Sequence, residues 1–341
     1  MTMSSKSPDV LYLNRSDIVT LGGEHSHIYV DAVGDALAAH ACGDYVQPLK
    51  PYLRRPGADH IADRIIAMPA YLGGEPAIAG VKWIGSRHDN PLQRGLERAS
   101  GLIILNDPQT NYPIAIMEAG LISGMRTAAV TAVAARHLAK KGFAHLVCIG
   151  CGPIARMQLT TMLEQFPSID RIHVFDRNPD AAEYLIEDVA AHFPKINYRI
   201  ETDAESAIGM AEVLVTCTVA DQPYISFDWL PKGAFISNVS IMDLHKEVFL
   251  KADKVVVDDW EQCNREKKII HQLVTEGSFS RARLYAELGE IVIGAKPGRE
   301  SDDEIILLNP MGMAIEDIAC ARHFYHLAQA RGVGTQLPLY G

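Results

Sequence analysis

The sequence predicts an α/β protein in which a doubly wound parallel sheet is joined to a second, α+β domain. Between residues 145 and 259 short apolar runs alternate with amphipathic stretches, which is typical of a parallel sheet with crossover helices. A glycine-rich turn follows the first of these runs. In the first third of the chain, candidate strands follow one another without intervening helices, which indicates an antiparallel or mixed sheet. The length of 341 residues exceeds the ~100–150 residues of a common domain, so two domains are expected.

The N-terminal part is expected to contain one helix and then a sheet. Apolar residues at helical spacing predict a helix over 27–42, and Gly43 ends it. Loops rich in Gly, Pro and Asp separate the expected strands, which span 61–68, 77–84, 101–106 and 112–117. We expect residues 1–125, together with 313–341, to form a substrate-binding and dimerisation domain.

Two further helices are expected to connect the domains. The alanine-rich segment 125–141 has apolar residues at helical spacing and a basic end, and it is predicted to lead into the second domain. The segment 313–331 follows the strand 305–310 and ends at Gly332, so it is expected to return the chain to the first domain.

Residues 126–312 are expected to form the nucleotide-binding domain. The apolar character of its strands indicates burial on both faces, as in parallel sheets. In chain order, the strands and helices on which this prediction rests are 145–150, 153–165, 171–176, 179–192, 213–218, 235–240 and 254–259.

Composition limits the classes of function. The longest apolar runs are far shorter than the ~20 residues that span a bilayer, and the N-terminus does not resemble a secretory signal, so a cytoplasmic protein is expected. The six cysteines are scattered in a chain large enough to fold without disulfides, and we expect them to be reduced. The formal net charge of −10 argues against a nucleic-acid partner and favours a small-molecule substrate.

The turn Gly150-Cys-Gly152-Pro153-Ile154-Ala has the G-x-G-x-x-A pattern between a strand and a helix, which is the dinucleotide-binding signature of the Rossmann fold. Its first glycine permits a tight turn, its second lets the backbone approach a pyrophosphate, and the helix N-terminus favours the phosphate charge. The alternative is a glycine turn without a ligand.

Further cofactor contacts are expected at the ends of the following strands. Asp176 lies where such folds place the acid that binds the adenosine ribose, which favours NAD over NADP, although the adjacent Arg177 would soften this preference. Thr218 and Ser240 end two later strands, and they are included among the expected cofactor contacts because ligands collect at the carboxyl ends of strands.

Cys148 and Cys151 form a C-x-x-C pattern, which by itself suggests redox chemistry or a metal. No second Cys or His pair supplies the remaining ligands of a zinc site, and Cys151 belongs to the phosphate turn. We therefore predict no metal.

Basic residues within apolar segments are the candidate substrate ligands. Arg64 and Lys82 lie in expected strands, where a buried charge needs a partner. A structural ion pair and a substrate carboxylate are the two interpretations. Arg126 is expected to open the interdomain helix, where a cation opposes the helix dipole, and this position favours ligand binding.

Asp243 follows the strand 235–240 of the nucleotide-binding domain, close to the expected nicotinamide position. An aspartate there is able to exchange protons with an amine or imine, and the alternative is a simple turn former. The sequence does not place His60, His88 and His245, which are further candidates for a cleft.

Several segments together resemble the ornithine cyclodeaminase/μ-crystallin family over nearly the whole chain. They are RIIAMP at 64–69, GVKWIG at 80–85, residues 104–129, IGCGPIA at 149–155 and GMAIEDIACA at 312–321. The resemblance implies an NAD cofactor, a homodimer, and contacts from Lys82, Arg126 and Arg64 to the substrate carboxylate. It also places Asp243, and Lys82 as a second proton-transfer residue, at the catalytic site.

Other segments, among them LYLNRSDI at 11–18 and residues 235–268, are similar to a siderophore-pathway branch of this family. This likeness implies oxidation of N-(2-amino-2-carboxyethyl)-L-glutamate to 2-oxoglutarate and L-2,3-diaminopropionate. Such a substrate carries three carboxylates, and the loop between 47 and 64 supplies Lys50, Arg54 and Arg55 as additional cations. Arg54 is included as a substrate contact. The alternatives are a redox-neutral cyclodeaminase that converts ornithine to proline and ammonia, and a non-catalytic binding protein.

Overall fold

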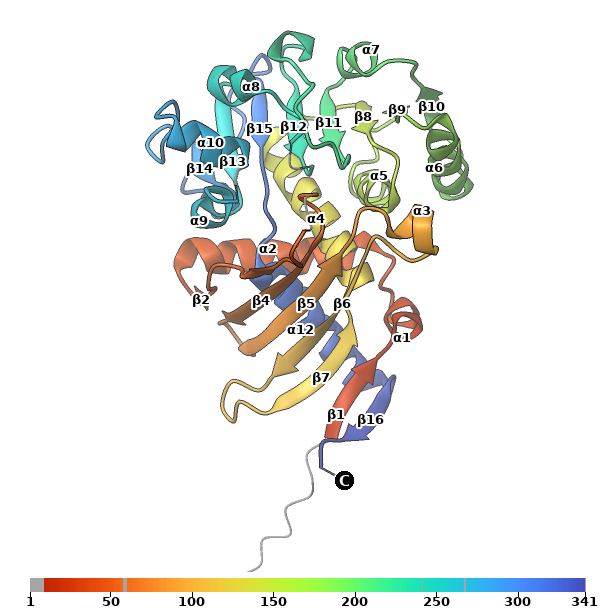
Figure 1. Cartoon of the computed structure of the whole chain (residues 1–341), viewed down its shortest axis with the longest axis vertical. Coiled ribbons are helices and arrows are strands. Elements are labelled where there is room, and N and C mark those ends of the chain that lie inside the picture. The colour runs from red at the N-terminus through yellow and green to blue at the C-terminus, as the bar shows by residue number, and fades with distance from the viewer. Residues whose placement is uncertain (1–8, 58–59, 241, 267, 341) are drawn as a thin grey trace, which may run out of the picture. The chain divides into compact units, whose positions relative to one another are not determined.

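The computed structural model describes residues 9–57, 60–240, 242–266 and 268–340 (Figure 1). Residues 1–8, which belong to the N-terminus on which the expectation about a secretory signal rests, lie outside these residues. The chain divides into two compact units, Met1–Ser123 with Met313–Gly341, and Gly124–Gly312.

The first unit contains an eight-stranded sheet in the order β16-β1-β7-β6-β5-β4-β2, with β3 also paired to β4. β1 runs parallel to β7 and the other pairs are antiparallel, so the sheet is mixed, as expected. The strands are β1 (Asp9–Leu13), β2 (Tyr45–Val46), β3 (Tyr52–Leu53), β4 (Arg64–Leu72), β5 (Ile78–Ser86), β6 (Ala99–Asn106), β7 (Pro113–Glu118) and β16 (Thr335–Pro338). The sequence predicted only β4 to β7.

Helices cover one face of this sheet. α12 (Ala314–Arg331) packs on β4, β5, β6 and α2 (Ser26–Cys42), and Figure 1 shows it behind the strands. Side chains alternate along β5, so Lys82 is buried toward α12 while Trp83, on the opposite face, is 47% exposed. Short helices α1 (Arg15–Thr20) and α3 (Asn90–Arg94) complete the unit.

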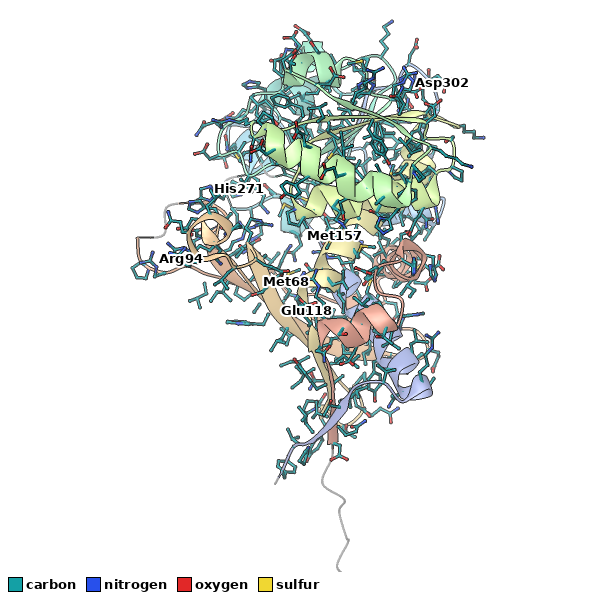
Figure 2. The ribbon with its side chains drawn as sticks, turned by 90° about the vertical axis from the view of Figure 1, so that its right-hand side faces the viewer. Met68, Arg94, Glu118, Met157, His271 and Asp302 are labelled. Carbon is teal, nitrogen blue, oxygen red and sulfur yellow. The ribbon has the colours of Figure 1, made fainter. Side chains whose placement is uncertain are left out.

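The long helix α4 (Gly120–Leu138) leads from the first unit into the second, and it begins five residues before the expected start at Met125. The carboxylate of Glu118, labelled in Figure 2, accepts hydrogen bonds from the backbone N–H groups of Gly120 and Leu121. This carboxylate satisfies otherwise unpaired donors of the first turn. Arg126 therefore lies inside the helix, and the expectation that it opens the helix is wrong.

The second unit is built on an all-parallel sheet in the order β10-β9-β8-β11-β12-β15-β13-β14. The strands are β8 (His145–Ile149), β9 (Arg171–Phe175), β10 (Asn197–Ile200), β11 (Val213–Thr216), β12 (Phe235–Asn238), β13 (Lys254–Val257), β14 (Ala286–Glu287) and β15 (Ile306–Leu308). The chain leaves β8 for β9 on one side and later returns to place β11 on the other. This reversal is the switch point of a doubly wound sheet, where ligands bind.

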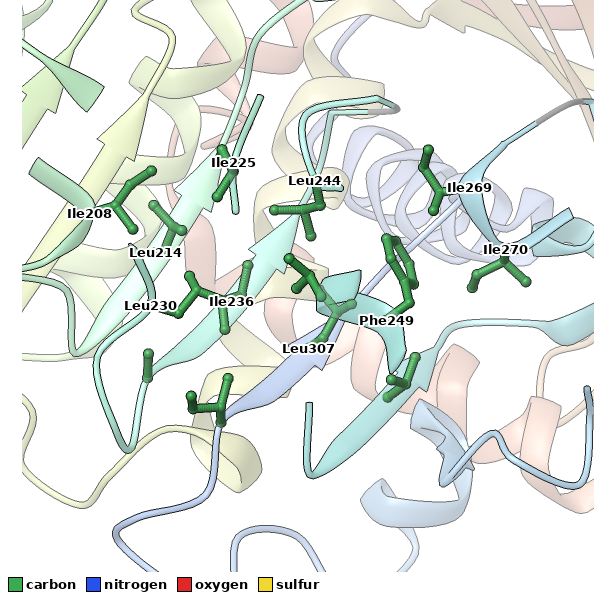
Figure 3. Close-up of a cluster of buried hydrophobic side chains, with 14 of the residues drawn as sticks. Ile208, Leu214, Ile225, Leu230, Ile236, Leu244, Phe249, Ile269, Ile270 and Leu307 are labelled. Atoms are coloured by element: carbon green, nitrogen blue, oxygen red, sulfur yellow. The ribbon is translucent and has the colours of Figure 1, made fainter. Parts of the chain in front are cut away.

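Helices pack on the second sheet and bury an apolar core. They are α5 (Pro153–Gln165), α6 (Pro179–His192), α7 (Ala204–Ile208), α8 (Lys246–Lys251), α9 (Trp260–Cys263), α10 (Ile269–Thr275) and α11 (Leu288–Val292), with a 3₁₀ turn η1 (Phe227–Trp229). In Figure 3, Leu214, Ile236 and Leu307 from three neighbouring strands lie with Phe249 of α8 in one buried cluster. Each such side chain contributes ~1.5–3 kcal/mol through burial.

The expected strands of this unit end one or two residues too late. Asp176, Thr218 and Ser240 lie beyond β9, β11 and β12, in the loops at the carboxyl edge of the sheet. Within the described part of the chain, none of the helices is both long and apolar enough to cross a membrane.

Candidate functional site

The glycine turn between β8 and α5 requires its first glycine. Gly150 has φ +92°, and a Cβ there would lie 2.8 Å from the carbonyl carbon of Cys217 and 2.9 Å from the nitrogen of Thr218. Its N–H donates to the carbonyl of Phe175 at 2.8 Å, which links the turn to the end of β9. The turn is therefore held tightly between the ends of β9 and β11.

The second glycine leaves space above the N-terminus of α5. Gly152 is the N-cap without a side-chain capping bond, and a Cβ built on it would meet no described atom within 4 Å. Pro153 occupies the first helical position and Ile154 follows, so the first turn presents backbone N–H groups toward this space. Such a helix end suits a phosphate group. These residues thus fit the pyrophosphate of a dinucleotide.

Asp176 stabilises the same turn. Its Oδ2 accepts a hydrogen bond from the N–H of Cys151 at 2.7 Å, and its Oδ1 accepts one from the N–H of Asn178 at 2.9 Å. The neighbouring Arg177 is exposed. A carboxylate at this position suits ribose hydroxyl groups and repels a 2′-phosphate, so the pocket chemistry fits NAD.

A chain of hydrogen-bonded polar side chains crosses the carboxyl edge of the sheet. The hydroxyl of Ser240 donates to Thr216 at 2.6 Å, Thr216 donates to Asn238 at 2.9 Å, and Asn238 donates to Asn309 at 2.7 Å. All four residues are buried, at 7% exposure or less. Because buried polar groups are costly unless paired, these hydrogen bonds fix the loops after β11 and β12.

Asp243 is fully buried beside these hydrogen-bonded side chains and accepts hydrogen bonds from two hydroxyl groups. Thr218 donates to its Oδ1 at 2.6 Å and Tyr224 donates to its Oδ2 at 3.1 Å. Burial raises the pKa of Asp243, while hydrogen bonds from Thr218, Ser240 and Tyr224 act in the opposite direction. Burial, followed by the adjacent Asp243, also raises the pKa of Tyr224 well above its ordinary value.

The sequence did not single out Tyr224. The backbone N–H groups of Tyr224 and Ile225 both donate to the carbonyl of Asp243 at 2.9 Å, and Ile225 forms a parallel bridge with Leu244. These contacts join two loops that are distant in sequence. A tyrosine followed by an apolar residue has no motif of its own, so only the tertiary structure identifies it.

Arg126 is 7% exposed and lies against Gly312. Gly312 has φ +72°, and a Cβ on it would approach Nη1 of Arg126 to 2.5 Å. The carboxylate of Asp258 holds this segment by accepting the N–H groups of Met311 at 2.8 Å and Gly312 at 2.5 Å. The φ of Gly312 disfavours any side chain there, and a Cβ would displace the guanidinium of Arg126.

In the first unit, Lys82 forms a buried ion pair. Its Nζ lies 2.7 Å from Oδ2 of Asp317 on α12 and 3.0 Å from the hydroxyl of Ser123, and both charged side chains are at most 1% exposed. The sequence did not single out Asp317, since nothing local marks it as the partner of a residue 235 positions away. The structure therefore contains the structural ion pair that was one of the two interpretations of Lys82.

Arg54 and Arg64 converge on one loop. Both donate to the carbonyl of Ile61, at 3.1 and 2.7 Å, and both guanidinium groups lie over the ring of Tyr52, at 5.8 and 5.2 Å from its centroid. Lys50 in the same loop is 2% exposed. The structure thus brings Arg54 and Arg64 together, as carboxylate recognition would require.

The three histidine candidates fall into different units. His60 and His88 stack in the first unit with ring centroids 4.0 Å apart. His245 of the second unit begins α8 and lines a cavity of about 590 Å³ together with Gln222 and Met242.

All six cysteines are free thiols, as expected. A hydrogen bond with Cys217 and burial raise the pKa of Cys148, and burial raises that of Cys151. Such thiols form little reactive thiolate at neutral pH. Such raised pKa values argue against a redox role for the C-x-x-C pair.

Comparisons with known proteins agree with this geometry. The model of the ornithine cyclodeaminase/mu-crystallin family matches residues 22–332. N-((2S)-2-amino-2-carboxyethyl)-L-glutamate dehydrogenase of Staphylococcus aureus is 63% identical over 333 residues, covering 97% of this chain and 99% of the relative. Alanine dehydrogenase of Archaeoglobus fulgidus is 33% identical, covering 91% of this chain and 93% of the relative.

Two solved structures have the same fold. The Δ1-pyrroline-2-carboxylate reductase of Thermococcus litoralis in complex with NADH and L-proline superposes with a TM-score of 0.88 at 31% identity, covering 96% of this chain and 100% of that one. An archaeal alanine dehydrogenase dimer with bound NAD gives 0.87 at 31% identity, with coverage of 97% and 100%.

Proposed function

Because the chain belongs to the ornithine cyclodeaminase/mu-crystallin family, we propose that it is an NAD-dependent dehydrogenase that cleaves N-[(2S)-2-amino-2-carboxyethyl]-L-glutamate. The products are L-2,3-diaminopropionate and 2-oxoglutarate. The observation that carries this proposal is the 63% identity to the S. aureus dehydrogenase over nearly all of both chains. The open glycine turn with Asp176 beside it supports NAD as the cofactor.

The reaction balances with water as the second reactant. The bond between hydrogen and the glutamate α-carbon breaks, and bound NAD supplies the acceptor for this hydride. The secondary amine loses a proton and a carbon–nitrogen double bond forms. Water adds to this imine, and collapse of the adduct separates 2-oxoglutarate from the primary amine of 2,3-diaminopropionate.

We assign proton transfer to Asp243. Its raised pKa brings a carboxyl group closer to neutral pH, where proton exchange is most efficient. Since Asp243 is fully buried, the hydroxyl groups of Thr218 and Tyr224 are the groups through which its proton reaches a reacting nitrogen. Lys82 is the second proton-transfer candidate, and its ion pair with Asp317 orients its Nζ.

We assign the substrate carboxylates to Lys82, Arg126, Arg64 and Arg54. Three of these are arginines, which bind carboxylates through paired N–H donors and so fix orientation as well as charge. Gly150 shapes the turn that faces the cofactor. We assign the cofactor contacts to Gly152, Pro153, Ile154, Asp176, Arg177, Thr218 and Ser240.

We further propose a homodimer that forms through the first unit. The face of its sheet opposite α12 carries partly exposed apolar side chains, including Trp83 at 47%, Leu102 at 43% and the intermediate Val81 and Ile104. An apolar surface of this kind marks an interface. Trp83→Glu is expected to shift the mass measured by light scattering from dimer to monomer, and the exposed Tyr184→Glu of α6 is the control.

The proposal includes a cytoplasmic location, which suits six reduced thiols, and a role in siderophore-precursor synthesis, which the sequence resemblance implies. It is tested by NADH absorbance with purified protein, NAD and synthetic substrate, beside ornithine with an ammonia assay. NADH with the first substrate alone supports the proposal. Ammonia from ornithine without net NADH would replace it with a cyclodeaminase, and no turnover of either would indicate a binding protein.

A further inference from the structure

A histidine–aspartate cluster lies at one end of the β4–β5 hairpin in the first unit. The antiparallel register pairs Arg64 with Ser86, so the residues just before β4 and just after β5 meet. Asp63 belongs to the first segment and His88 to the second. His60 joins them through a turn in which its carbonyl accepts the N–H of Asp63 at 3.0 Å. The strands therefore hold the cluster in place.

The three side chains converge to a distance suited to a shared cation. Each offers one ligand atom, and these atoms all lie within 4.8 Å of one another. Oδ1 of Asp63 accepts hydrogen bonds from the backbone N–H of His88 at 2.8 Å and from its Nδ1 at 2.9 Å. Hydrogen bonding to a carboxylate fixes the orientation of a histidine ring.

The rings of His60 and His88 stack, with centroids 4.0 Å apart and planes inclined by 17°. The stacking keeps the two imidazoles side by side next to the carboxylate of Asp63. The cluster thus combines two imidazoles with one carboxylate.

The ion pair of Asp63 and His88 does not by itself require the second ring. The N–H of Ala62 donates to Nδ1 of His60 at 3.1 Å, near the long end of the normal range. An ion bound at this nitrogen would replace that hydrogen bond.

We propose that His60, Asp63 and His88 form a binding site for one divalent transition-metal ion of the Zn²⁺ type. Two imidazole nitrogens and a carboxylate oxygen are the ligand types that Zn²⁺ accepts, at ~2.0–2.2 Å. Three protein ligands leave a fourth position for water or for a carboxylate oxygen of a small molecule. Metal binding is measured without substrate or NAD. A failure of this proposal is therefore distinguishable from a failure of the proposed dehydrogenase activity.

The test is titration of tag-free, chelator-treated full-length protein with Zn²⁺ in a calorimeter, and with Co²⁺ by visible absorption. We expect one ion per chain, with affinity reduced at least 10-fold in His88→Gln and in Asp63→Asn. His27→Gln is the matched control, because His27 is an exposed histidine of the same unit with a neighbouring ring, that of His25, 6.2 Å away. This variant should bind as the parent does.

Cys42 is the exposed thiol that could bind the same ions, so Cys42→Ser is titrated in parallel. Retained binding in Cys42→Ser, together with Co²⁺ bands that lack thiolate charge transfer, supports the site. The proposal is overturned if the parent binds no ion more tightly than about millimolar, if His88→Gln binds as well as His27→Gln, or if binding disappears in Cys42→Ser. Should His88→Gln lower the melting temperature, His60→Gln supplies the same comparison.

Discussion

The ion pair between Lys82 and Asp317 allows a quantitative test of the packing of α12 on the sheet. Both side chains are at most 1% exposed, and their charged atoms are 2.7 Å apart. Asp317→Asn keeps the shape of the side chain but leaves the ammonium without its counter-charge. Removal of one partner from a buried pair costs ~3–5 kcal/mol. For a unit of this length, each kcal/mol lowers Tm by roughly 2–4 °C, so a fall of roughly 6–20 °C is expected.

Differential scanning calorimetry measures this fall, with Asp31→Asn as the control because Asp31 is exposed on α2 of the same unit. The double variant Lys82→Met with Asp317→Leu removes both charges and is expected to recover to within about 2 kcal/mol of the parent. Its activity then separates the two roles of Lys82. If the folded double variant loses turnover, the lysine acts on the substrate as well as on stability.

The reasoning would be refuted if Asp317→Asn melted within about 1 °C of the control, because a buried ammonium would then tolerate the loss of its partner. It would equally be refuted if the double variant lost more free energy of unfolding than the sum of the losses in Lys82→Met and Asp317→Leu. In either case the two charges would not be coupled in the folded protein.

Three further predictions concern the second unit. Gly150→Ala is expected to cost ~1–3 kcal/mol of stability through backbone strain. By contrast, Gly152→Ala should leave Tm unchanged. It should weaken NAD binding, measured by fluorescence titration, by at least about 10-fold, or ~1.4 kcal/mol. Asp176→Ala should narrow the preference for NAD over NADP, measured as a ratio of kcat/KM values. Because the folded pKa of Asp243 is raised, its stabilising contribution is full below the unfolded pKa near ~3.9 and is lost as pH rises through the folded pKa. Asp243→Asn should therefore gain Tm relative to the parent as pH rises through that window, and an unchanged difference would contradict the shift.

Long periodic elements were the most predictable part of the fold. The limits expected for 153–165 and 179–192 match α5 and α6, since both helices begin with proline at the first position and repeat apolar residues at helical spacing. The two-residue strands β2 and β3 were not predicted, because pairing with β4 makes them strands and two residues carry no period. The start of α4 was missed because Glu118 caps it from within the preceding strand.

In the candidate site, too, residues in local motifs were predictable from the sequence, whereas partners distant in sequence were not. The glycine turn and Asp176 were visible because the chemistry of phosphate and ribose binding depends on residue types at fixed local spacing. Tyr224 and Asp317 were invisible as partners, since their contacts join segments that are 19 and 235 residues apart. The sequence showed that Lys82 needed a partner, but only the packing of α12 identifies it.

The cost of burying Asp243 is itself an argument about its role. An asparagine would accept the hydroxyl of Thr218 and avoid the penalty that burial places on a carboxylate. A group that is retained in its ionisable form where an amide would be more stable is a candidate for proton transfer. Asp243→Asn should therefore be more stable than the parent at high pH and yet lose at least about 100-fold in kcat. A variant that gained stability and kept its turnover would reduce Asp243 to a residue that positions Thr218 and Tyr224.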